Sequence, residues 1–475
     1  MSDGIIPAKL KREMSPFGGL VITLTNMSPS IAVFIAAPVV IQQSGSFVIV
    51  ACLLAILLGC VVSGVYAELG SAFPHAGGDY VLVGNTLGPT ARFACLAMGL
   101  VGTAVALALS ALGVADFLKV AAPAVEPIPC AMVCIVLVTA MAALSVRMNA
   151  WITGLFLLIE VATLIATAVL GFGHPRNDLL EAMIHPVMAA PRGGLQATPL
   201  IAMALAGSAA IYTLNGYASA VFFGEEVVGA RRKLVWIIYG ALLLGGATIV
   251  PPLMGVVVGA PDLARLSASA TPLQDFIVAV GGQGIAALIS LGVAMAIFNA
   301  MIAIALIGGR ILYAAARENA WHPRLNDALA TVHHDFGSPW IATLVVGAGG
   351  LALCLLPLPV LVMINGSGAA VGYGLVSLGL IAGRRTGATA SSRSVMPLHP
   401  IGPVIVILTA LGLVGAALTD PVSGRPGVFV SLGVMTLGAL YYRLVVRRSD
   451  AWAHHDPDEE ELVISAELAT PVVEV

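Results

Sequence analysis

The chain has 475 residues, of which 59% are hydrophobic and only 10% are charged, and its formal net charge is −3. This near-neutral charge balance gives no indication of a nucleic-acid partner, and the size rules for soluble domains do not apply to so apolar a chain. Apolar runs of about 20 residues recur along nearly its whole length, each long enough to cross a hydrocarbon core of about 30 Å. The sequence therefore predicts an all-α polytopic membrane protein.

Twelve apolar segments are predicted to be transmembrane helices, separated by turns rich in Gly, Pro and Asp. They are residues 17–42, 46–70, 91–118, 127–145, 149–172, 198–223, 234–258, 284–310, 340–356, 358–382, 401–419 and 427–446. The first run is too long for the apolar region of a cleavable signal peptide. All six cysteines fall in apolar runs without a CxxC pair, so we expect small buried hydrophobic residues and neither disulfides nor a metal site. No cofactor is expected.

The distribution of positive charge predicts the orientation of the chain. If the N-terminus is cytoplasmic, 17 of the 22 Lys and Arg residues fall on the cytoplasmic side, as the positive-inside rule requires. The other side holds only Lys119, Arg176, Arg192, Arg265 and Arg425. The count predicts that both termini are cytoplasmic. The expected location of the protein is the plasma membrane. Residues 1–16 form the cytoplasmic N-terminus, and residues 449–475 form an acidic, solvated tail.

Two of the predicted spans carry polar interruptions. The first span contains Pro29, which removes a backbone donor, so we expect a kink or an unwound turn near residues 26–30. The sixth span contains Thr213, Asn215 and Gly216, although a polar interruption at membrane depth is tolerated only where it faces protein or a water-filled cavity. The simpler alternative is a pair of kinked structural helices whose side chains bond the freed backbone groups.

These interruptions occupy matching positions, because spans 1 and 6 open two successive sets of five. Interrupted helices at corresponding positions of two halves are typical of inverted-repeat transporters that bind substrate near the membrane midplane. Freed N–H groups suit a carboxylate, and freed C=O groups suit an ammonium. The pair of breaks therefore predicts a site for a zwitterionic amino acid.

Glu160 lies in the middle of the fifth span, with no Lys or Arg nearby in its own helix. An unpaired carboxylate in hydrocarbon costs at least about 3 kcal/mol, so we expect Glu160 to face the bundle interior and to be functional. Burial favours its neutral form, which suits the exchange of a proton during a transport cycle. The alternative is a protonated or hydrogen-bonded structural residue.

Other polar residues have weaker indications. Asn299 and Asn365 are expected either to line the cavity or to join helices by hydrogen bonds. A further group is expected to consist of solvated charges at the membrane boundary, with an inner gate as the alternative: Glu68, Glu225, Glu226, Arg231–Lys233 and Arg310.

Four stretches carry motifs in a fixed order. They are Asn26-Met-Ser-Pro-Ser30, Tyr66-Ala-Glu-Leu-Gly-Ser-Ala-Phe-Pro-His-Ala-Gly-Gly-Asp-Tyr80, Leu214-Asn-Gly-Tyr-Ala-Ser-Ala followed by Gly224-Glu-Glu226, and Asn299-Ala followed by Arg310-Ile-Leu-Tyr-Ala-Ala-Ala-Arg317. Together they resemble helices 1, 2, 6 and 8 of the amino acid–polyamine–organocation (APC) superfamily of transporters, to which the amino acid permeases belong. The chain departs from the common pattern at Asn26–Ser30, where many members are glycine-rich, and at Asn215, where an acid is common.

The resemblance implies a LeuT-like fold, with inverted five-helix repeats over residues 17–172 and 198–382 and two additional helices over residues 401–446. It implies that backbone groups at the two breaks bind the substrate and that two aromatic residues act as gates, ordinary helix aromatics being the alternative. The substrate-binding residues it assigns are Asn26, Met27, Ser28, Ser30, Tyr212, Thr213, Asn215 and Gly216. The gating residues are Tyr212 and Tyr217.

The resemblance also bears on coupling. Glu160 falls where several members carry a lysine, so the lysine mechanism does not carry over. Sodium-driven relatives use a hydroxyl pair on helix 8, whereas residues 284–309 hold a single hydroxyl, that of Ser290. Proton coupling is therefore expected, and exchange or uniport is the alternative.

The sequence as a whole predicts a secondary active transporter that imports or exchanges an amino acid by alternating access, as a monomer or homodimer surrounded by lipid. No metal, nucleophile or phosphate motif indicates an enzyme. A transporter of a polyamine, ethanolamine or another organic amine is the alternative within this class. From another class, a transport-inactive amino acid sensor would signal through the tail, and removal of residues 450–475 would abolish its output while sparing a transporter.

Overall fold

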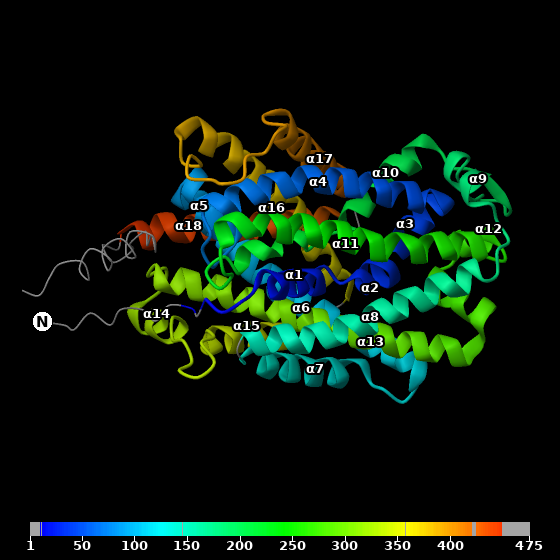
Figure 1. Cartoon of the computed structure of the whole chain (residues 1–475), viewed down its shortest axis with the longest axis horizontal. Coiled ribbons are helices and arrows are strands. Elements are labelled where there is room, and N and C mark those ends of the chain that lie inside the picture. Colours follow the sequence, from blue (N-terminus) through cyan, green and yellow to red (C-terminus); the bar gives the residue numbers. More distant parts are fainter. Residues whose placement is uncertain (1–9, 11, 145, 357, 420–423, 449–475) are drawn as a thin grey trace, which may run out of the picture.

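The computed structural model describes residues 10, 12–144, 146–356, 358–419 and 424–448, and for some helical residues, Tyr212 among them, it describes the backbone only. Figure 1 shows long helices running side by side along the long axis of the molecule. The short helix α14 (Pro323–Leu329) lies near one end, and α9 (Leu179–Ile184) and α12 (Leu263–Ala268) lie near the other. We call these the α14 end and the α9 end. The predicted tail, residues 449–475, lies outside the described residues.

Each predicted span coincides with helical structure. The first span is divided into α1 (Pro16–Met27), α2 (Pro29–Ile31), the π-helix η1 (Ala32–Ala36) and α3 (Ala37–Ser44). The sixth is divided into α10 (Leu200–Thr213) and the 3₁₀-helix η3 (Tyr217–Phe222). The other spans are α4 (Val48–Ala72), α6 (Pro89–Ala121), α7 (Pro127–Ala142), α8 (Val146–Phe172), α11 (Ala230–Gly259), α13 (Pro272–Arg317), α15 (Trp340–Leu353), α16 (Leu358–Thr386), α17 (Ile401–Thr419) and α18 (Gly424–Leu444).

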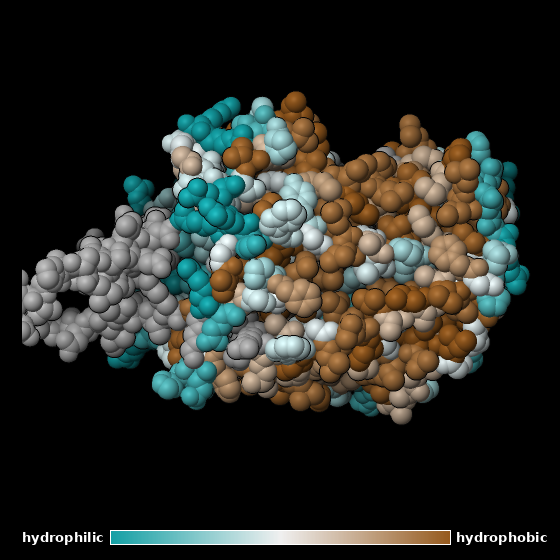
Figure 2. All heavy atoms as spheres, in the orientation of Figure 1, coloured by the Kyte–Doolittle hydropathy of each residue, from teal (hydrophilic) through white to brown (hydrophobic). Residues whose placement is uncertain are grey.

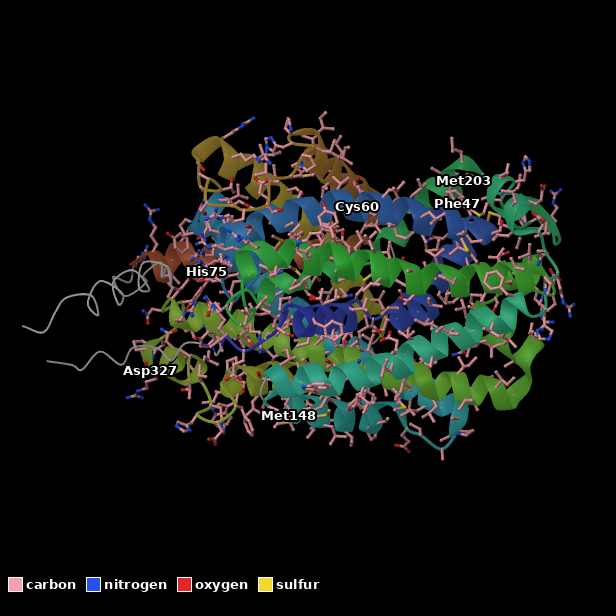
Figure 3. The ribbon with its side chains drawn as sticks, in the orientation of Figure 1. Phe47, Cys60, His75, Met148, Met203 and Asp327 are labelled. Carbon is pink, nitrogen blue, oxygen red and sulfur yellow. The ribbon has the colours of Figure 1, made fainter. Side chains whose placement is uncertain are left out.

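The surface of the bundle is suited to lipid. Among the described residues, eight helical segments are long and apolar enough to cross a membrane, and α7 and α15 are shorter apolar helices. Figure 2 shows a broad apolar band between two polar ends, and large side chains such as Leu57, Trp151 and Leu288 are 65–78% exposed. Figure 3 shows Cys60 on α4 well away from both ends. Apolar surface on this scale is stable only when something apolar covers it, which identifies a multi-pass membrane protein.

The connections contain more structure than the sequence predicts. The loop between residues 174 and 197 forms α9 and a hairpin of β1 (Val187–Ala189) and β2 (Leu195–Ala197), in which Val187 pairs with Ala197. The loop after residue 260 forms α12 and the first turns of α13, which bends at Gly282. Between α4 and α6, the chain forms α5 (Asp79–Leu87), which packs against α6 and α16. The short 3₁₀ turns are η2 (Gly45–Phe47) and η4 (Val446–Arg448).

The helix that carries the first break lies inside the bundle. Helix α1 begins at Pro16, and the Ser15 hydroxyl accepts a hydrogen bond of 3.0 Å from the Gly18 amide, as expected of an N-cap followed by proline. It packs against α8, α11, α13 and η3. The fold thus surrounds the first break with helices from both predicted repeats.

Candidate functional site

The first break is a real interruption of the helix. Helix α1 ends at Met27 because Ser28 has a φ of 40°, which a non-glycine residue rarely adopts, and because Pro29 has no N–H to offer. The Ser28 amide donates to the carbonyls of Leu24 and Thr25, at 3.0 and 3.1 Å. The Ser28 hydroxyl accepts from the Ile31 amide at 3.4 Å and so caps α2. The prediction of an unwound turn at residues 26–30 is confirmed.

The second break meets the first one directly. Helix α10 ends at Thr213, and Gly216 turns the chain into η3 with a φ of 112°. A Cβ atom at position 216 would lie 2.7 Å from Met27 Cα and 2.9 Å from Met27 N. Only glycine permits this φ and this approach at once, so Gly216 allows the two breaks to come into contact.

A cavity of about 500 Å³ adjoins both breaks and extends between α4, α5, α6, α13 and α16. This volume lies in the range of about 300–1,000 Å³ typical of small-molecule sites. The predicted site residues on its wall are Asn26, Met27, Thr213, Asn215, Gly216 and Asn365. Five others are not on the wall: Ser28, Ser30, Glu160, Tyr217 and Asn299. The side chain of Tyr212, one of the two predicted gates, lies outside what the structure describes.

The Glu160 carboxylate lies behind the first break, on α8. Its Oε1 atom accepts hydrogen bonds from the Ser30 amide at 2.7 Å and from the Ser28 hydroxyl at 3.1 Å. Its Oε2 atom has no hydrogen-bond partner among the described residues, and the residue has no exposed surface. Glu160 therefore faces the bundle interior. Its carboxylate accepts the hydrogen bond of the Ser30 amide at the N-terminus of α2, an amide that the resemblance assigns to a substrate carboxylate.

Comparison with known proteins agrees with this architecture. The sequence pattern of the family described as "Amino acid permease" matches residues 16–437, which include both breaks and nearly every span. The chain belongs to the amino acid permease family. Two relatives named uncharacterized transporters, from Mycobacterium bovis and Mycobacterium tuberculosis, are each 29% identical over 357 residues, covering 73% of this chain and 74% of the relative. The protein is therefore a membrane transporter of a small molecule and not an enzyme.

Two predicted residues of the permease, Asn299 and Tyr217, are buried away from the cavity wall. Asn299 is fully buried on α13, and its Nδ2 atom donates to the Thr153 carbonyl of α8 at 3.1 Å. This bond joins two helices, as the packing alternative for Asn299 requires. Tyr217 is buried in η3 with 3% of its surface exposed.

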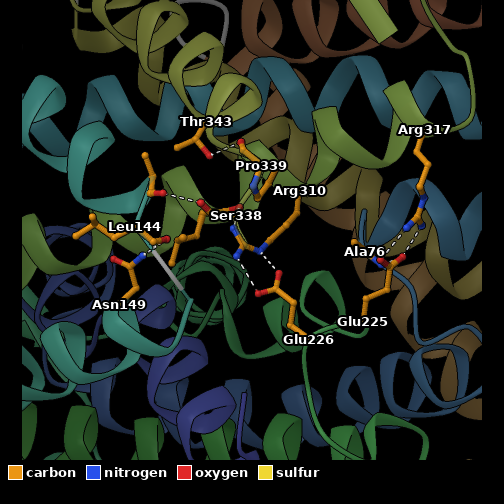
Figure 4. Close-up of polar contacts among 12 residues, drawn as sticks. Ala76, Leu144, Asn149, Glu225, Glu226, Arg310, Arg317, Ser338, Pro339 and Thr343 are labelled. Atoms are coloured by element: carbon orange, nitrogen blue, oxygen red, sulfur yellow. Dashed lines mark hydrogen bonds and ion pairs between the residues drawn. The ribbon is translucent and has the colours of Figure 1, made fainter. Parts of the chain in front are cut away.

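Buried ion pairs hold the α14 end of the permease together, as Figure 4 shows. Arg310 binds Glu226 through two hydrogen bonds of 2.6 and 3.0 Å, and Arg317 binds Glu225 through two of 2.8 and 2.5 Å. Glu225 also accepts from the Ala76 amide at 3.0 Å. All four charged side chains are less than 10% exposed. The interpretation of Glu225 and Glu226 as solvated charges is wrong, because each carboxylate has a bidentate arginine partner from α13.

Glu68 is also buried and paired. Its carboxylate accepts hydrogen bonds of 2.7 and 2.5 Å from Arg384 of α16 and one of 2.7 Å from the Met396 amide. Only 3% of the Glu68 side chain is exposed, so a solvated glutamate is again excluded. The pair ties α4 to α16, two helices whose residues are far apart in the sequence.

Three cavity residues escaped the sequence analysis. Tyr373 of α16 donates a hydrogen bond to Asn215 Oδ1. The Tyr66 ring packs edge-on against the Tyr373 ring, with 6.1 Å between centroids, and its hydroxyl donates to Asp79 Oδ2 at 3.2 Å. The signal available for Asp79 was an acid directly after two glycines, Gly77 and Gly78, near the end of the Tyr66–Tyr80 motif.

Proposed function

We propose that this permease is a secondary active transporter that moves an amino acid across the cytoplasmic membrane by alternating access. The observation that carries the proposal is the contact between Gly216 and the Met27 backbone, which joins two helix breaks at the wall of one cavity. Broken helices that meet inside a membrane bundle offer N–H and C=O groups to the charged ends of a zwitterion.

The proposal includes the architecture inferred from the sequence. Residues 17–172 and 198–382 form two inverted five-helix repeats, and residues 401–446 add two helices, for twelve spans in all. Both termini are cytoplasmic, because this orientation gives the cytoplasmic side 17 of the 22 Lys and Arg residues. The buried pairs of Glu225 and Glu226 with arginines of α13 lie at the α14 end, where they form the inner gate.

Glu160 couples transport to the proton gradient. An ionised Glu160 and a substrate carboxylate both require the amide donor at the N-terminus of α2, and two like charges at one donor repel each other. Protonation removes the charge of Glu160 and weakens its hold on the Ser30 amide. Proton and substrate therefore bind together, which is the condition for symport. In exchange or uniport, the second mechanism, Glu160 keeps its bonds to Ser28 and Ser30 throughout the cycle.

Uptake by the purified full-length chain in vesicles tests the coupling. With an inwardly directed proton gradient, the wild type is expected to accumulate amino acid above equilibrium. The Glu160→Gln variant, which mimics the neutral acid, is expected to keep counterflow exchange and to lose gradient-driven accumulation. Glu181→Gln, which changes an exposed acid on α9, is the matched control. Unchanged accumulation by Glu160→Gln would remove Glu160 from the coupling mechanism.

A further inference from the structure

Asp79 is a carboxylate on the wall of the central cavity with no role in the mechanism above. It is the first residue of α5, outside the membrane-spanning helices. The preceding Gly78 has a φ of 54°, and a Cβ atom there would lie 2.1 Å from the Phe222 ring of η3. The turn that presents Asp79 to the cavity is thus fixed by glycine and by the segment that follows the second break.

Among the described residues, the hydrogen-bond partner of the Asp79 carboxylate is one hydroxyl group and not a cation. Its Oδ2 atom accepts from the Tyr66 hydroxyl at 3.2 Å, whereas Oδ1 is buried and has no hydrogen-bond partner among the described residues. Two arginines on the helices beside α5 have acids of their own, since Arg92 of α6 binds Glu318 at 2.7 Å and Arg384 of α16 binds Glu68. In the part of the chain that the structure describes, no cation is paired with Asp79.

Asp79 is connected to the second break by aromatic side chains. Tyr66 packs against Tyr373, and the Tyr373 hydroxyl binds the side chain of Asn215. Helix α16 approaches Asp79 closely at Gly372, where a Cβ atom would lie 3.8 Å from Oδ2. These residues and the carboxylate line the same cavity. A ligand that contacts the break at Asn215 can therefore reach Asp79 with a second group.

A carboxylate in this position favours a cationic ligand. Burial raises the pKa of Asp79 to about 6, and the hydrogen bond from Tyr66 offsets only part of the shift. The other titratable groups on the wall are Tyr66, Tyr80, Cys95, Tyr373 and the second acid Asp116, none of which is a cation. At neutral pH, the carboxylate is ionised and only partly solvated. Because no protein cation pairs with it among the described residues, a positively charged ligand would stabilise it. The rings of Tyr66 and Tyr373 line the same cavity and can add cation–π attraction to a bound cation.

We propose that Asp79, Tyr66 and Tyr373 form a subsite for a positively charged group of the substrate, an ammonium or a guanidinium. The inference rests on the proposed transport function and narrows its substrate class. The second break itself carries the neutral Asn215, and Asp79 supplies a negative charge on the same cavity wall. The substrate is therefore a cationic amino acid or an organic amine rather than a neutral amino acid.

Binding by the purified full-length chain tests this subsite. Thermal unfolding is followed with paired probes that differ in one charge: lysine with norleucine, and arginine with citrulline. The wild type is expected to bind the cationic member of a pair about tenfold more tightly than the neutral member. Asp79→Asn is expected to abolish this preference. Asp79→Glu keeps the charge and is expected to retain the preference. Asp116→Asn, which changes the other acid on the cavity wall, is also expected to retain it.

Each outcome is decisive. Equal binding of both members, stabilisation by the neutral members only, no binding of any cationic member, or a preference that survives Asp79→Asn overturns the proposal. If Asp79→Asn does not fold, two other variants test the subsite. Tyr66→Phe removes the hydroxyl donor and leaves the carboxylate, and Asp79→Glu keeps the charge. The subsite is overturned if Tyr66→Phe leaves the cation preference unchanged and Asp79→Glu loses it.

Counterflow in vesicles separates the two proposals. Uptake of norleucine without lysine upholds transport and removes the subsite, whereas binding of lysine without any counterflow upholds the subsite and removes transport.

Discussion

The contact between the two breaks makes Gly216→Ala the most informative single substitution. The new Cβ atom would lie 2.7 Å from Met27 Cα, about 0.7 Å closer than the 3.4 Å at which ordinary van der Waals contact begins. Overpacking of this kind costs about 1–3 kcal/mol, and the φ of 112° adds about 1–3 kcal/mol for a residue with a side chain. The total of roughly 2–6 kcal/mol exceeds the 1.4 kcal/mol that corresponds to a factor of ten in affinity.

We therefore expect Gly216→Ala to reduce substrate affinity by at least about tenfold, because the two breaks must separate to admit the methyl group. Affinity is measured by thermal shift and by the KM of vesicle uptake. Gly207→Ala is the matched control, since Gly207 lies in α10 and a Cβ atom there has nothing within 4 Å. Unchanged affinity and stability in Gly216→Ala would refute the idea that the breaks form one site.

Three further predictions concern the gate, the cavity wall and pH. Glu226→Gln leaves Arg310 buried without its partner, so the thermal unfolding midpoint in detergent should fall by the equivalent of about 3–5 kcal/mol, and adding Arg310→Met should restore part of the loss. An unchanged midpoint would show that the pair is not buried. Tyr373→Phe removes one hydrogen bond to Asn215, worth about 0.5–1.5 kcal/mol, and should raise the uptake KM about two- to tenfold without changing the midpoint. An equal loss of thermal stability would point to a purely structural role. Because burial raises the pKa of Asp79 to about 6, its carboxyl is charged above that pH and neutral below it, so the preference for cationic probes should be present at pH 7.5 and lost at pH 5. A preference independent of pH would exclude Asp79.

The helices and the breaks were predictable because their signals are local. A run of about 20 apolar residues specifies a span wherever it occurs, and Pro29 or Gly216 interrupts a helix through its own backbone chemistry. Local patterns also mark Glu160, since a carboxyl in an apolar run has to face the interior. They do not reveal its partner, because the approach of Glu160 to the Ser30 amide depends on the packing of α8 beside α2.

The remainder of the site depends on contacts between distant segments. Tyr66 and Tyr373 meet only after α4 and α16 have packed together, and Asp79 reaches the cavity only because α5 folds between α6 and α16. Glu68, Glu225 and Glu226 resembled solvated boundary charges because their arginine partners, on α16 and α13, lie far away in the sequence. The position of a charged residue near the end of a predicted span does not reveal whether it is solvated or buried in an ion pair.

The most direct test of the account is a structure of the full-length chain bound to the probe that stabilises it most. The account predicts that the ligand contacts the Met27 backbone and Gly216 where the two breaks meet, with its positive group directed toward Asp79. A ligand bound elsewhere, with both breaks unoccupied, would contradict the central claim that the broken helices form the substrate site.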